Sequence, residues 1–191
     1  FLSWKYRVLF VVSAGNISDS FEVLGYSTGA AMRAATPEHR RAELLCAIDA
    51  AKSQRTILAP AEAVNDLTVG AAHCDGSPLT LPNSIADPYG DKAVPILGSA
   101  LGHGFNRSVK PDVVLPGGRQ IALATEGPML RVHSREHADR YGQLVATPDP
   151  NTGHLDLTRM SAGTSNAAAL ATRLGLMIGD VLDDSPVNAG M

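Results

Sequence analysis

The chain has few cysteines and no long apolar run, and each absence excludes a class of protein. Only Cys46 and Cys74 occur among its 191 residues, too few for a disulfide framework or a four-cysteine metal site. No apolar run reaches the roughly 18 residues that a membrane-spanning helix needs. We therefore expect no membrane association, a reducing and cytoplasmic setting, and a core position for Cys46 within a helix.

A strong charge of either sign is also lacking. Lys and Arg number 16 against 19 for Asp and Glu, for a formal net charge of −3. No basic run carries interleaved aromatic residues, which argues against nucleic acid as a partner. The length is sufficient for one sizeable domain, spanning residues 1–191. Phe1 to Lys5 resemble neither a start nor a signal peptide, so we expect the chain to begin inside a longer polypeptide.

The pattern of apolar residues predicts an α/β fold with a mainly parallel sheet flanked by helices. Thr36-Pro37-Glu38 is typical of a helix start, and the amphipathic segment that follows is expected to cover the sheet with Arg40 on its solvent side. Residues 126–158 are expected to leave the core, with a polar helical patch around 134–141. Strand candidates occupy residues 8–12, 55–60, 66–71, 111–116, 120–124 and 155–158.

The stretch Met160 to Ala171 contains a small Ser-Ala-Gly run, then Thr-Ser, then an alanine-rich apolar segment reaching about Leu182. A segment that is apolar on nearly every side predicts a buried helix. Ser165 would then lie at the positive N-terminal end of this helix, where developing negative charge is stabilised. Taken alone, the stretch also fits a capping serine without chemistry.

Asn16 follows the continuous apolar run Val8 to Val12 and the residues Ser13-Ala14-Gly15. Such a run suits a strand buried on both faces of a parallel sheet. Its carboxyl end is the edge where sites gather in open α/β sheets. Asn16 also fits an ordinary turn residue.

Four segments, in this order, resemble the subtilisin-like serine proteases, or subtilases. They are Val11 to Asn16, Leu67 to Ala71, Lys110-Pro111-Asp112-Val113-Val114-Leu115-Pro116-Gly117, and Ser161-Ala162-Gly163-Thr164-Ser165-Asn166-Ala167-Ala168. The first resembles the family's strand that ends in the oxyanion-hole asparagine, and the last resembles its Gly-Thr-Ser nucleophile motif. The resemblance spans residues 8 to about 182, with sizeable insertions.

This resemblance implies a serine endopeptidase acting on peptide or protein substrates. Ser165 would be the nucleophile, and Asn16 would donate its side-chain amide to the oxyanion, with the backbone N–H of Ser165 as a second donor. Ser13, Ala14 and Gly15 would line the pocket for the substrate residue before the scissile bond. We expect no cofactor or metal; calcium is implied only by the family likeness.

The sequence departs from the family pattern in what precedes Asn16. Subtilases run Asp, His, Ser along the chain, whereas all six histidines lie after Asn16, and neither the Asp nor the His motif occurs. We therefore expect an N-terminal segment outside this sequence to carry the Asp and His, and this chain alone to be inactive. Ala169 also stands where the family usually has proline.

Three alternatives remain open from the sequence. A catalytically dead subtilase-like domain kept for binding or scaffolding is the main one, because the deciding Asp and His are absent. His133-Ser134-Arg135-Glu136-His137 matches the His-x-x-Glu-His pattern of zinc peptidases, but it lies in a charged, solvated patch. An unrelated serine esterase ranks last, because the Gly-x-Ser-x-Gly pattern is missing.

Overall fold

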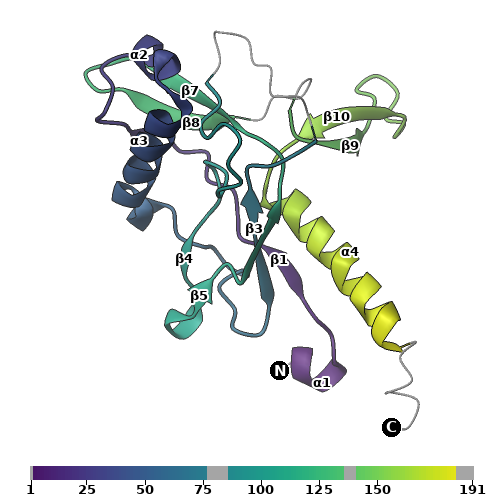
Figure 1. The fold of residues 1–191 in the computed structure, drawn as a ribbon. Helices are drawn as coiled ribbons and strands as arrows, with labels where there is room; N and C mark the ends of the chain where they lie inside the picture. The colour runs from purple at the N-terminus through teal and green to yellow at the C-terminus, as the bar shows by residue number, and fades with distance from the viewer. Residues whose placement is uncertain (1, 77–85, 136–140, 184–191) are drawn as a thin grey trace.

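A computed structural model describes residues 2–76, 86–135 and 141–183, and its centre is a parallel sheet (Figure 1). The sheet contains β1 (Val11–Ser13), β3 (Leu67–Ala72) and β6 (Val113–Pro116), in the order β1-β3-β6. Both pairings are parallel, as the apolar runs predict. The long helix α4 (Thr164–Asp183) packs against all three strands.

The first turns of α4 share a small core with the parallel sheet. Ala167 and Ala171 pack against Val69 and Ala71 of β3, together with Ile96. Alanines on the helix and small residues on the strand bring the two backbones close together. This packing sets the height at which the N-terminus of α4 lies over the sheet.

A second and larger core lies between an antiparallel sheet and two helices. The sheet has the order β2-β8-β7 and comprises β2 (Phe21–Glu22), β7 (Ile121–Thr125) and β8 (Arg131–Arg135). The helices are α2 (Gly29–Ala34) and α3 (Pro37–Ala50). Thr36 caps α3 through its hydroxyl, which accepts from His39 N at 3.3 Å, and Pro37 occupies the first turn as predicted.

The remaining elements are short. They are α1 (Leu2–Tyr6), the 3₁₀ turns η1 (Lys52–Gln54) and η2 (Phe105–Arg107), the hairpin of β4 (Gly102–His103) with β5 (Val109–Lys110), and the ribbon of β9 (Gln143–Thr147) with β10 (Leu157–Ser161). The β9–β10 ribbon lies at the N-terminal end of α4 (Figure 1). No described helix combines the length and apolar character needed to cross a bilayer.

Several local predictions are wrong. The first strand begins at Val11 rather than Val8, and residues 55–60 form turns and irregular backbone instead of a strand. The predicted helical patch begins instead within strand β8, and its residues 136–140 lie outside the described residues. Cys46 is exposed, not a core residue.

The side chain of Arg40, predicted to face solvent, is buried instead. Its Nη1 donates to the carbonyls of Met32 and Ala35 at 3.2 and 3.1 Å, and its Nε donates to Asp87 O at 2.6 Å. The guanidinium therefore satisfies carbonyl groups at the end of α2 and ties α3 to the segment around Asp87. Helix α3 covers the antiparallel sheet through β2, and not the parallel one.

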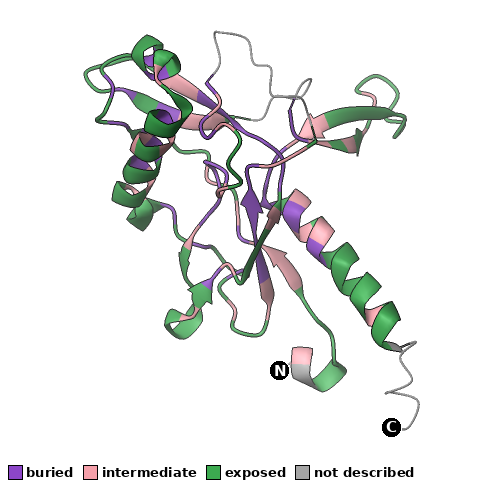
Figure 2. Cartoon of the chain, viewed as in Figure 1, coloured by how far each residue is buried: buried purple, intermediate pink, exposed green. Residues whose placement is uncertain are grey.

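Helix α4 is not the buried helix that its composition predicts. Its first turns are buried or half-buried, whereas most of its C-terminal part is exposed (Figure 2). Leu176 is 67% exposed and Val181 71%. The apolar composition is thus in place, but the described part of the chain covers only the first turns.

Candidate active site

Asn16 lies just beyond the carboxyl end of β1, as the sequence predicts. The backbone leaves the sheet through Ala14, whose N–H donates to Val69 O at 2.9 Å, and turns at Gly15, where φ is +107°. A positive φ of this size favours glycine. Asn16 then forms an isolated bridge with Ser99, and its side chain is exposed.

The side chain of Asn16 is fixed against the head of α4, although 148 residues separate it from Thr164. Its Oδ1 accepts from Thr164 N at 3.0 Å and from Thr164 Oγ1 at 3.2 Å. A backbone N–H can only donate, so the atom that faces Thr164 must be the amide oxygen. Nδ2 consequently points away and donates to none of the described residues, which leaves it available to a ligand.

Thr164 is fully buried and holds both sides of this junction. Its Oγ1 accepts from Gly15 N at 3.2 Å while it donates to Asn16 Oδ1. Gly163 provides the space for the amide, because a Cβ at this position would lie only 3.0 Å from Asn16 Nδ2. Sequence reasoning placed Thr164 only within the Gly-Thr-Ser segment and missed this contact.

Ser165 is exposed in the first turn of α4. The first N–H groups of a helix have no partner within the helix. Thr164 N donates to Asn16, and Ala167 N reaches Gly163 O at 3.5 Å, but Ser165 N has no partner among the described residues. A hydroxyl, a free backbone N–H and the neighbouring Asn16 side chain therefore occur together at the positive end of a helix.

The predicted pocket residues Ser13, Ala14 and Gly15 lie directly before Asn16. Ser13 is half-buried in β1, and Ala14 is fully buried. Gly15 faces Ala100, whose Cβ would lie 3.7 Å from a Cβ added to the glycine. The side chain of Ala14 is therefore not accessible to a ligand, and Gly15 has none, so only Ser13 could contribute side-chain atoms.

The Lys110-Pro111-Asp112 segment lies away from Asn16 and Ser165, at the amino ends of β3 and β6. Lys110 Nζ is buried and donates to Asp66 O and to Asp112 Oδ2, each at 2.7 Å. Asp112 Oδ2 also accepts from Thr68 N at 2.7 Å. Burial opposes ionisation of Asp112, but the hydrogen bonds from Lys110 and Thr68 outweigh it and hold the pKa of this carboxyl below its ordinary value. This motif serves the fold.

No described histidine is hydrogen-bonded to Ser165. His73, which is buried, accepts from Gln120 N at Nδ1 (3.4 Å), so a neutral ring carries its proton on Nε2, facing Asp87 Oδ1 at 3.2 Å. Burial raises the pKa of Asp87, but the hydrogen bonds from His73 and from the N–H groups of Tyr89 and Gly90 lower it overall. The imidazole of His73 is thus committed to Asp87.

The zinc-like histidine motif has the wrong secondary structure for an i, i+4 pair. His133 lies in strand β8, and His137 lies outside the described residues. Within the part of the chain that the structure describes, no three His, Cys, Asp or Glu side chains gather as a metal site.

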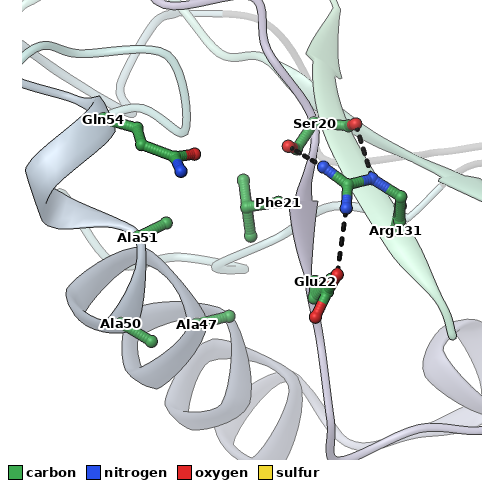
Figure 3. Close-up of a pocket in the computed structure, with 8 residues that line it drawn as sticks. All are labelled: Ser20, Phe21, Glu22, Ala47, Ala50, Ala51, Gln54 and Arg131. Atoms are coloured by element: carbon green, nitrogen blue, oxygen red, sulfur yellow. Dashed lines mark hydrogen bonds and ion pairs between the residues drawn. The ribbon is translucent and has the colours of Figure 1, made fainter.

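A pocket of about 300 Å³ lies between α3 and the β2–β8 pair, remote in sequence from the Ser165 segment (Figure 3). The Phe21 ring and alanines of α3 form its apolar side. The guanidinium of Arg131 at its rim is already bound to Glu22 Oε1 at 3.1 Å and to Ser20 O at 2.6 Å. Figure 3 shows the pocket lined by Ser20, Phe21, Glu22, Ala47, Ala50, Ala51, Gln54 and Arg131.

Sequence reasoning also missed a buried polar group beyond the ends of β3 and β6. Arg119 Nε donates to Asp75 Oδ1 at 2.9 Å, and its Nη1 lies 3.9 Å from Asp87 Oδ2. Asp75 and Asp87 lie in a segment for which the sequence predicts no helix, strand or motif. Their position after a buried strand was the available signal, because polar residues at the carboxyl edge of a parallel sheet gather near sites.

Comparison with known proteins gives one finding. The family model described as "Subtilase family" matches residues 3–184, nearly the whole chain. No curated protein matches, and no solved structure does. The match covers the parallel sheet, the Asn16 turn and α4, and with them the segments that carry the resemblance. The chain belongs to the subtilase family, whose members are subtilisin-like serine peptidases.

Proposed function

We propose that this chain supplies the nucleophile and the oxyanion hole of a subtilisin-like serine endopeptidase. The observation that carries the proposal is the pair of hydrogen bonds from Thr164 to Asn16 Oδ1, at 3.0 and 3.2 Å. They hold the amide beside the exposed Ser165 with Nδ2 free to donate. A neutral donor fixed before the reaction stabilises charge as it develops and needs no reorganisation.

In this mechanism Ser165 Oγ attacks the carbonyl carbon of the scissile peptide bond, and its proton passes to a base. The carbonyl oxygen becomes an oxyanion that accepts from Asn16 Nδ2 and from Ser165 N. The C–N bond then breaks, and the leaving amine takes the proton from the base. Water hydrolyses the resulting ester on Ser165 by the same steps, which regenerates the hydroxyl.

We assign the base and its orienting carboxylate to a polypeptide segment outside this sequence, because no described histidine is hydrogen-bonded to Ser165 and the family's His motif is absent from the sequence. Two features support a covering segment. Among the described strands, β1 pairs only with β3, so its outer edge is open. In addition, apolar side chains are exposed on the C-terminal part of α4 and in the segment that precedes β1. They are Leu9, Leu174, Leu176, Met177, Ile178 and Val181. Apolar surface of this extent marks an interaction face.

The substrate residue before the scissile bond would lie along Ser13, Ala14 and Gly15. Because Ala14 is buried, its contribution would come from backbone atoms. Gly15 has a positive φ and no side chain, so no Cβ occupies the space between its backbone and Ala100. Peptides with a small or flat side chain at this position would then be accommodated most easily.

The test compares this chain with a longer protein that includes the segment carrying the Asp and His. A fluorophosphonate probe is expected to label the longer protein and not its Ser165→Ala variant, and not the isolated chain, whose serine stays protonated. Asn16→Ala is expected to lower kcat by roughly 10²–10³, the cost measured in subtilisin itself for loss of its oxyanion asparagine.

Two outcomes would contradict the proposal. Labelling of the isolated chain that disappears in Ser165→Ala would require a base within residues 1–191. A longer protein that contains both motifs, folds, and neither labels nor cleaves peptides would favour the catalytically dead scaffolding domain instead. Thr172→Ala is the matched control, because Thr172 is an exposed hydroxyl residue of the same helix.

A further inference from the structure

The chain segment that follows β6 is joined to the segment that ends β3 by three successive N–H donors. Gly117 N donates to Ala72 O at 3.0 Å, and Gly118 N donates to Cys74 O at 3.1 Å. Arg119 N then donates to a side chain, Asp75 Oδ2, at 3.0 Å. The carboxylate of Asp75 therefore extends the backbone pairing beyond the end of the sheet.

The same carboxylate binds a third part of the chain. Asp75 Oδ2 accepts from Gly142 N at 2.8 Å, and Oδ1 accepts from Arg119 Nε at 2.9 Å. The side chain of Asp75 is 1% exposed. The guanidinium of Arg119 lies 5.2 Å from the centre of the Tyr141 ring, next to Gly142. Asp75 thus ties the turn after β6 to the residues that enter β9.

The backbone that leads to the nucleophile runs directly against these two tied segments. Gly163 N donates to Gly117 O at 2.8 Å. A Cβ at Gly118 would lie 2.7 Å from Ser161 O, and one at Gly142 would clash with the same carbonyl even more severely. Ser161 to Gly163 therefore contact Gly117, Gly118 and Gly142 with no side chain in between.

We infer that Asp75 is a positioning residue for Ser165. By holding Arg119 and Gly142 together, it fixes the backbone against which Ser161–Gly163 lie, and so the point at which α4 begins. Asn16 and Thr164 fix the opposite side of that point. The inference rests on the proposed function, since it assigns Asp75 to the nucleophile of that reaction. A misplacement of about 1 Å can cost about 10²-fold in rate.

The test uses the longer protein with its Asp and His segment, and the variant Asp75→Asn. The amide keeps the shape of the side chain but turns one acceptor into a donor, so either Arg119 Nε or the two backbone N–H groups lose their acceptor. We expect kcat per active site to fall about 10- to 100-fold with KM nearly unchanged, because Asp75 does not touch the substrate path. Active sites are counted by exhaustive fluorophosphonate labelling.

Asp49→Asn is the matched control, because Asp49 forms an exposed ion pair with Lys52 at 3.0 Å on a distant helix; kcat should stay at the wild-type value. Arg119→Lys is the second variant. It keeps the charge and the backbone N–H but removes Nε, and an intermediate loss of kcat is expected.

The inference is overturned if folded Asp75→Asn has a lower melting temperature but an unchanged kcat per labelled site, which is the behaviour of a purely structural residue. It is also overturned if neither variant folds, because the pair is then a requirement for folding rather than for positioning. Failure of the proposed function is recognised separately: either the longer protein with Asp75 intact neither labels nor cleaves peptides, or Ser165→Ala retains wild-type activity or labelling.

Discussion

Thr164→Val is the change that tests most directly how the two parts of the proposed oxyanion site are joined. Valine matches threonine in shape and suits a fully buried position, so the change removes only the hydroxyl. Two hydrogen bonds are lost, the one from Gly15 N at 3.2 Å and the one to Asn16 Oδ1 at 3.2 Å. The bond from Thr164 N to Asn16 Oδ1 remains.

The magnitude follows from these two bonds. A neutral hydrogen bond contributes about 0.5–1.5 kcal/mol net, and a buried donor left without a partner costs toward the upper end. Gly15 N loses its acceptor, whereas the exposed Asn16 can turn to water. We therefore expect Thr164→Val to lower the free energy of unfolding by about 2 kcal/mol. Asn16→Ala should cost about 1 kcal/mol, because its side chain is exposed.

The two changes share one bond, so their effects should not add. The double variant is expected to be more stable than the sum of the single changes predicts, by about 0.5–1 kcal/mol. Urea unfolding of the isolated chain, followed by far-ultraviolet circular dichroism, measures all four proteins. Thr172→Val is the matched control: Thr172 Oγ1 donates to Ala168 O at 2.9 Å on the exposed side of the same helix, and a change within about 0.5 kcal/mol is expected.

The reasoning is refuted if Thr164→Val stays within about 0.5 kcal/mol of the wild type, or if the double variant shows strict additivity. Either result would mean that the Thr164 hydroxyl does not hold the Asn16 amide. Of the two hydrogen bonds on which the proposed mechanism rests, only the one from Thr164 N would then remain.

Three further predictions concern other parts of the chain. The lowered pKa of Asp112 implies a stabilisation that is present above its unfolded pKa of about 3.9 and is lost as the pH falls through the lower folded pKa. The urea midpoint of the wild type should therefore fall as the pH is lowered below about pH 4. In Asp112→Asn this fall should be smaller, because the titrating carboxyl is absent. Gly142→Ala should lower the free energy of unfolding by about 1–3 kcal/mol or more, because φ is +127° and a Cβ would clash with Ser161 O. Gly175 has open space around it, so Gly175→Ala should raise the free energy of unfolding by up to about 1 kcal/mol in the same assay. Leu176 is exposed in this chain, so Leu176→Gln should change the stability of the isolated chain by less than about 0.5 kcal/mol. In the longer protein a covering segment would bury this leucine, and the change should lower the stability by about 1.5–3 kcal/mol in thermal unfolding. Equal effects in both proteins would refute a covering segment.

The parts of the fold that sequence predicted well are those specified by local chemistry. Thr36 and Pro37 define the start of α3 through a cap and a fixed φ, and both act within one helical turn. The strand candidate at residues 66–71 corresponds to β3, the central strand of the parallel sheet, in which residues 68–72 are buried. Asn16 and Ser165 were found at strand and helix ends, where backbone groups are open to a ligand.

The parts that failed depend on contacts made far along the chain. Arg40 carries a charge and was assigned to solvent, yet it is buried because carbonyl groups at the end of α2 and at Asp87 surround it. Cys46 has the size of a core residue, but its place on α3 faces outward. His133 fits a helical motif by spacing alone, while pairing with Leu123 of β7 makes it part of a strand. The type of a residue does not show which residues, distant in the sequence, will surround it in the fold.

The burial of α4 was also predicted wrongly, but for a different reason. The exposed part of this helix is apolar, and the described part of the chain supplies nothing that covers it. A helix apolar on all sides predicts burial, and only the first turns find cover against β1, β3 and β6. One donor of the proposed oxyanion site, Ser165 N, lies in the first turn of α4. The other, Asn16 Nδ2, belongs to the amide that Thr164 holds beside this turn. This half of the site is thus built within the chain and can be measured there by unfolding.

Proton transfer, in contrast, would need the covering segment, and its contribution is measurable only in the longer protein. The same variant therefore separates two costs. If Thr164→Val lowers stability by about 2 kcal/mol in the chain and lowers kcat further in the folded longer protein, the hydroxyl orients the amide for the reaction. If kcat per folded molecule is unchanged, the hydroxyl stabilises the junction alone, and the remaining bond from Thr164 N is sufficient to aim Asn16 Nδ2.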